Sequence, residues 1–92
     1  MVVLTTTWSL RIPEARSLKE KRMAIRSLKD RLRKLNLSVA EVDGHDRWGT
    51  AVLAATVVAT DGAFADSVMS KADRMVEGEH RVLIVGTERF LN

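Results

Sequence analysis

The sequence contains no cysteine and no tyrosine, and only one proline, in 92 residues. Without cysteine the chain can form neither disulfides nor thiolate metal sites, which fits a reducing cytosol. No apolar run approaches the roughly 18 residues of a membrane span, and no signal peptide is recognisable. Phosphate-binding glycine loops, nucleophile elbows and helical zinc motifs are also missing. We therefore expect a cytoplasmic protein without cofactor or metal that is not an enzyme.

The remaining composition is that of an ordinary globular chain. Hydrophobic residues make up 46% and charged residues 29% of the sequence. A chain of this length has room for one hydrophobic core, so residues 1–92 are expected to form a single domain. Aromatic residues make up only 4%. This scarcity argues against a sheet that reads bases by stacking, as an RNA-recognition motif does.

The net charge of +3 conceals an uneven distribution. Between Arg11 and Leu35 there are ten Lys or Arg and three Asp or Glu, a balance of +7. The rest of the chain has five Lys or Arg and nine Asp or Glu, a balance of −4. Such an asymmetry suggests an anionic partner on one side of the protein, although a solvated basic helix would show the same pattern.

The stretch Pro13 to Asn36 predicts one long amphipathic helix. Ser17 and Glu20 have the spacing of a capping box, which places the helix start there. An apolar stripe with a 3.6-residue period follows. Basic residues lie beside this stripe, where like charges repel unless an anion neutralises them. We predict an anion- or nucleic-acid-binding site formed by Arg16, Lys19, Lys21, Arg22, Arg26, Lys29 and Arg33.

The rest of the chain alternates strand and helix patterns. Apolar residues alternate from Val2 to Ile12, in Leu37 to Asp43, and from Trp48 to Thr60, and Val82 to Leu91 completes the set of strands. Asp61 is a suitable N-cap and Gly78 a suitable left-handed stop for a second helix. The order β-α-β-β-α-β predicts an α+β, ferredoxin-like fold, a four-stranded antiparallel sheet with two helices on one face.

Two segments resemble a known family. The sequence RIPEARSLKEKR from Arg11 to Arg22, followed by SVAEVDGHDRW from Ser38 to Trp48, resembles the YlxP-like family of small bacterial proteins. The resemblance implies a ferredoxin-like fold and a role near RNA or the ribosome, because genes of this family tend to lie among those of translation factors. It implies no catalytic residues. The signature positions are Arg11, Pro13, Arg16, Ser17, Leu18, Lys19, Glu20, Lys21, Arg22, Glu41, Asp43 and Trp48.

The predicted function is therefore that of a non-catalytic RNA- or ribosome-associated protein. Its first helix would contact phosphates, which gives affinity but little sequence specificity. The alternative is a protein-interaction or assembly module that binds an acidic partner through the same helix. A small phosphatase using Arg16 is less favoured, because the glycine-rich loop of acylphosphatases is missing. Trp48 is expected to pack at the start of a strand rather than to stack on a base.

Two further features of the sequence bear on a metal site and on a dimer surface. Asp43, His45 and Asp46 lie within one tight turn and cannot easily converge on a metal ion, so a polar hairpin turn is favoured. The face of the sheet away from the helices carries Thr and Val residues. Such an apolar open face is a candidate surface for a homodimer, although a Thr-rich sheet can also remain exposed.

Overall fold

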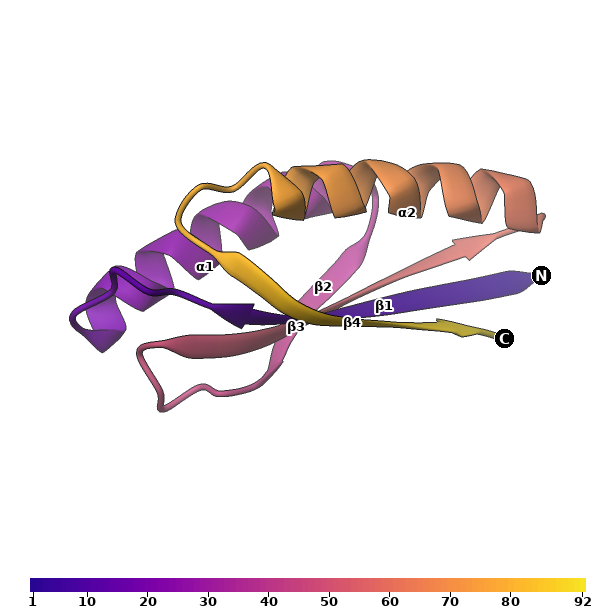
Figure 1. Ribbon diagram of the computed structural model, residues 1–92. Helices are drawn as coiled ribbons and strands as arrows, with labels where there is room; N and C mark the ends of the chain where they lie inside the picture. The colour runs from indigo at the N-terminus through magenta and orange to yellow at the C-terminus, as the bar shows by residue number, and fades with distance from the viewer.

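The computed structural model describes all 92 residues and has the predicted order of elements (Figure 1). Four strands form one antiparallel sheet in the order β2-β3-β1-β4, and both helices lie on the same face of it. The prediction of a ferredoxin-like fold is thus confirmed. The elements are β1 (Val2–Arg11), α1 (Leu18–Arg33), β2 (Ser38–Asp43), β3 (Thr50–Ala59), α2 (Gly62–Glu77) and β4 (Leu83–Leu91).

The central strands β1 and β3 form the floor of the core. Along both strands, buried side chains that face the helices alternate with side chains on the open face. Trp8 of β1 is fully buried, as its place on the inner face predicted. On α2 the buried positions are Ala65, Met69, Ala72 and Val76, whereas Phe64 is 58% exposed. The apolar stripe of α2 therefore begins one residue after Phe64, where small side chains allow the helix to approach the sheet.

The helix ends follow the sequence signals only in part. The Ser17 side chain caps α1 by accepting from the Glu20 N–H at 3.2 Å, as predicted. The Glu20 carboxylate accepts from the N–H of Arg16 instead of that of Ser17, so the capping box is not reciprocal. The predicted left-handed stop at Gly78 is wrong, since this residue has φ −80° and continues the helical turn. Near Gly86 the register of β1 with β4 shifts between Ser9 and Leu10, which indicates a β-bulge.

The ammonium group of Lys21 connects α1 to the turn between β2 and β3. Lys21 is fully buried, and its Nζ donates to the carbonyl oxygen of Gly44 and lies 2.7 Å from Oε2 of Glu41. A buried charge is tolerated only when such partners compensate the lost hydration. The prediction that Lys21 belongs to an external anion site is therefore wrong. The helical period places it in the apolar stripe, and Glu41 neutralises it there.

A second buried charge, Glu79, fixes the connection from α2 to β4 against α1. Glu79 is 5% exposed and accepts from the Nε and Nη2 atoms of Arg81 at 2.9 and 3.0 Å. Arg31 of α1 donates to the same carboxylate at 2.5 Å. Hydrogen bonds from Arg81 outweigh the cost of burial and lower the pKa of Glu79 to about 2. The ionised carboxylate therefore holds the two segments together at neutral pH.

This ion pair should make stability depend on pH. Because the folded-state pKa is depressed, the stabilisation is complete above the ordinary carboxyl pKa and is lost as pH falls through about 2. We expect Glu79→Gln to lower the unfolding free energy by about 1–3 kcal/mol at neutral pH. This range allows for screening by solvent, because the side chains of Arg31 and Arg81 are each 39% exposed. In urea titrations the difference from wild type should shrink below pH 4.5. Glu77→Gln, on an exposed carboxylate, is the matched control, and an equal effect of both changes would contradict the assignment.

The Lys21 contact gives a second stability prediction. Lys21→Met fills the same space but leaves Glu41 without its cation, and should cost about 2–4 kcal/mol of unfolding free energy. Adding Glu41→Gln should recover part of that loss, with a coupling energy of about 1–3 kcal/mol in a double-mutant cycle. Denaturant unfolding of wild type, the two single variants and the double variant measures this coupling energy. Strictly additive effects would show that the two side chains do not act as a pair.

Candidate nucleic-acid interface

Five predicted site residues form a basic row along one flank of α1: Lys19, Arg22, Arg26, Lys29 and Arg33. At about 100° per residue they fall within an arc of about 80°, and at about 1.5 Å per residue they extend over roughly 21 Å. Lys29 is half-buried and the others are exposed. These five residues are called the basic row below. Arg16, also exposed, precedes the helix at the end where the basic row begins.

The basic row faces the β2 edge of the sheet. Its last member, Arg33, donates to the carbonyl oxygen of Val39 in β2 at 3.2 Å. On the opposite flank of α1, Arg31 reaches the α2–β4 connection through Glu79. Because β2 is an edge strand, the side of α1 that carries the basic row has no further element beside it. The tertiary structure thus leaves this row open to a partner.

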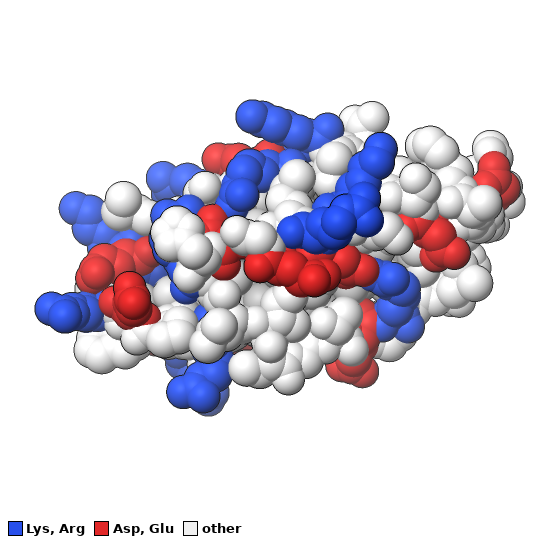
Figure 2. Space-filling model, turned by 45° about the horizontal axis from the view of Figure 1, so that its top comes forward, with Lys and Arg blue, Asp and Glu red and all other residues white.

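The cations of the basic row differ from the cations that meet other parts of the chain in whether a carboxylate neutralises them. Arg31, Arg81, Arg89 and Lys21, the cations that meet other parts of the chain, each form an ion pair with a carboxylate. In the basic row only Arg33 has one, with exposed Asp30 at 3.6 Å. Arg16, Lys19, Arg22, Arg26 and Lys29 have none. Figure 2 shows Lys and Arg side chains gathered around the end of the molecule where α1 begins, with some acidic side chains among them.

The end of the molecule where α1 begins also carries the β2–β3 hairpin, because Lys21 bonds to Gly44 in that turn. The hairpin presents Arg47 and Trp48, both exposed. The expectation that Trp48 packs at a strand start is wrong: β3 begins only at Thr50, and 56% of the Trp48 side chain is exposed. Sequence reasoning also passed over Arg47 as a site residue. The sequence shows the turn signal that precedes Arg47, but only the contact between Lys21 and Gly44 places this turn beside α1.

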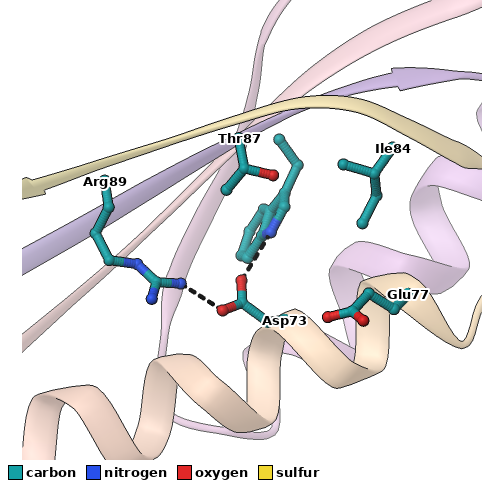
Figure 3. Close-up of a pocket in the computed structure, with 6 residues that line it drawn as sticks. Asp73, Glu77, Ile84, Thr87 and Arg89 are labelled. Carbon is teal, nitrogen blue, oxygen red and sulfur yellow. Dashed lines mark hydrogen bonds and ion pairs between the residues drawn. The ribbon is translucent and has the colours of Figure 1, made fainter.

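Of the hollows in the surface, one contains a polar network that is complete within the protein. This cavity of about 390 Å³ lies between α2 and β4, and Figure 3 shows Arg89 directed toward Asp73. The carboxylate of Asp73 accepts from the indole of Trp8 at 3.0 Å and from Arg89 at 2.6 Å. Arg89 also donates to buried Thr6 at 2.9 Å. These groups satisfy one another, so the network stabilises the packing of α2 on β4.

No helix of the structure is both long enough and apolar enough to cross a membrane. This agrees with the absence of a long apolar run in the sequence. The basic row is a surface of charged side chains on a small α+β domain, and its residues lie on one helix flank rather than in a cleft. Such a surface can bind an extended anion by charge and hydrogen bonding, whereas chemistry would require convergent groups.

Two solved structures that resemble the fold are designed proteins. One, described as the de novo designed protein Foldit4, has a TM-score of 0.59 at 8% identity, with 100% of this chain and 97% of that chain covered. Another, the de novo designed protein LFR1 1 with ferredoxin fold, has a TM-score of 0.58 at 16% identity, with 100% and 86% covered. At these identities the likeness concerns the fold alone.

Comparison at the level of sequence gives the family. A search of the curated proteins finds no relative of the chain. A family model described as "Protein of unknown function (DUF503)" matches residues 3–89, which include the whole basic row, the hairpin and all but the last residues of β4. The chain therefore belongs to the DUF503 family.

Proposed function

We propose that this protein is a non-catalytic, cytoplasmic RNA-binding protein that contacts the phosphate backbone through the basic row of α1, with Arg16 at its start. The observation that carries the proposal is the contrast between the two flanks of the helix. Cations that face the protein are neutralised by carboxylates, whereas four of the five in the basic row have no ion pair. Maintaining unpaired like charges along one flank costs stability unless an anion is bound there.

The geometry of the basic row suits a phosphate backbone. The row is linear, extends roughly 21 Å at about 1.5 Å per residue, and lies next to an edge strand rather than in a cleft. Several phosphates spaced along a nucleic acid could meet successive side chains, and the released counterions would supply much of the affinity. Such contacts position the protein without reading sequence. The resemblance of Arg11 to Trp48 to the YlxP-like proteins adds a reason to test ribosomal RNA first.

RNA binding across a salt series tests the proposal. With ribosomal RNA and an unrelated duplex, we expect log K to fall with log salt with a slope of about −3 to −5 between about 50 and 200 mM. Arg22→Glu combined with Arg26→Glu should weaken binding more than tenfold and reduce the slope by about 2, since each reversal removes one phosphate contact. Fluorescence anisotropy gives both quantities, and circular dichroism checks the fold.

The matched control exchanges two cations on the other helix. Lys71 and Arg74 of α2 are exposed and form no ion pair, so Lys71→Glu combined with Arg74→Glu gives the same change in net charge. If the α2 variant loses binding as strongly as the α1 variant, net charge and not the basic row is responsible. If wild type binds no RNA even at low salt, the proposal is wrong and an acidic protein partner becomes the better candidate.

We also propose that two copies associate through the open face of the sheet. Val58 is 62% and Phe90 48% exposed on this face, and Val3 lies beside Val58 in the pairing of β1 with β3. The strands β1 and β3 have 10 residues each, β4 has 9 and β2 has 6. At about 3.4 Å per residue and about 4.8 Å between strands, the face offers roughly 500–600 Å² per copy. Two copies would bury about 1,000 Å² in total, the lower end of what a specific interface needs. Around Val58 this face carries Val3, Thr5, Thr56 and Phe90, so two copies can meet there without burying like charges.

Sedimentation velocity over a range of concentrations tests the dimer. Val58→Asp should shift the protein to monomer, because it places a charge within the apolar part of the contact. Met23→Asp is the control, since Met23 is 59% exposed on the outer surface of α1 and the change in charge is the same. Wild-type protein that sediments as a monomer throughout would rule out this interface.

A further inference from the structure

A groove of about 190 Å³ opens at one end of the open sheet face, where β1 and β3 meet the β2–β3 hairpin. Arg11 contributes to it from the end of β1 and Arg47 from the hairpin. Thr50 is the register partner of Arg11, and Ser9 precedes Arg11 on the same face, so their two hydroxyls also line the groove. Val58 pairs with Val3 and Phe90 pairs with Thr5, both at the opposite end of β1. The groove therefore lies at the opposite end of the open face from Val58 and Phe90.

The two arginines of the groove have no partner within the protein. Neither Arg11 nor Arg47 forms an ion pair, and neither side chain donates a hydrogen bond to another residue. The one carboxylate at the groove, that of Asp43, accepts from the backbone N–H of Gly44 at 2.7 Å. Two guanidinium groups with two hydroxyls form a suitable set of donors for a phosphate group, because guanidinium matches phosphate in charge and in planar geometry.

Trp48 adds an aromatic surface next to Arg47. More than half of its side chain, 56%, is exposed, whereas the other tryptophan, Trp8, is fully buried. An exposed indole beside phosphate-binding arginines is the combination that binds single-stranded nucleic acid, because each unpaired base offers a flat face for stacking. In a duplex the bases are already stacked on one another and cannot reach it. The pair Arg47–Trp48 thus favours an unpaired nucleotide over a helix.

We propose that this groove binds one phosphodiester of single-stranded RNA between Arg11 and Arg47, with an adjacent base stacked on Trp48. The inference rests on the proposed RNA-binding function and specifies the kind of RNA, but it uses residues outside the basic row. Lys21 acts as a positioning residue, because its hydrogen bond to Gly44 holds the hairpin that carries Arg47 and Trp48. The same hairpin lies next to the start of the basic row, so one RNA strand can contact both surfaces.

Binding of a short fluorescent oligouridylate, measured by anisotropy beside a duplex RNA, tests the groove. Trp48→Ala should weaken oligouridylate binding by about 5- to 100-fold, the range for loss of one base–aromatic stack, and leave duplex binding unchanged. Trp48→Phe should restore part of the affinity, because phenylalanine still stacks. Arg11→Ala combined with Arg47→Ala should lower the salt slope for the oligouridylate by about 0.7, the value for one phosphate contact of a single strand. Lys71→Ala combined with Arg74→Ala removes the same charge from α2 and should leave binding close to wild type.

The outcomes separate this inference from the proposed function. All substituted side chains are exposed, so circular dichroism and thermal unfolding should match wild type. If the groove variants bind oligouridylate like wild type while Arg22→Glu with Arg26→Glu does not, the groove is overturned and the basic row stands. If oligouridylate binding depends on Trp48 and the arginines but not on the basic row, the groove stands and the role of α1 is overturned. Wild-type protein that binds no RNA overturns both.

Discussion

The buried ammonium of Lys21 is the interaction on which the arrangement of the charged end of this molecule depends. A charge in the core must find compensating partners, and here they are the Gly44 carbonyl and the Glu41 carboxylate, both from the β2–β3 side of the sheet. The first turn of α1 is thereby fixed to the hairpin. The basic row and the groove consequently lie on either side of the β2–β3 hairpin, and the Lys21 side chain fixes their relative positions.

The distribution of charge follows from which cations meet the rest of the chain. Arg31, Arg81 and Arg89 point toward α2, β4 and their connection, where Glu79 and Asp73 neutralise them. These pairs are partly exposed, and their role is to fix the elements relative to one another as much as to add stability. The cations on the other flank of α1 have no element beyond them because β2 ends the sheet. The topology thus separates structural cations from those that remain for a partner.

The fold also explains why this chain differs from sheet-based RNA readers of the same topology. Its open face presents Thr, Val and Ala side chains on the central strands, without aromatic groups that could stack on several bases. The exposed Trp48 instead lies in the hairpin, at the edge of that face. The proposed dimer and the proposed RNA contacts therefore rest on different parts of the surface, the Val58 end of the open face and the charged end of the molecule.

The sequence by itself determined the elements and their order. Alternation fixed the inner face of β1, Ser17 and Asp61 marked the helix starts, and the 3.6-residue period defined the flank with Arg22 and Arg26, because these signals are local. The period also placed Lys21 in the apolar stripe but could not reveal whether Glu41 or an external anion would neutralise it. Contacts between residues distant in sequence decided which group neutralises Lys21. They also decided that Trp48 is exposed and that Arg11 and Arg47 line one groove. Such contacts depend on strand register and on a hairpin docked against a helix, which no local pattern encodes.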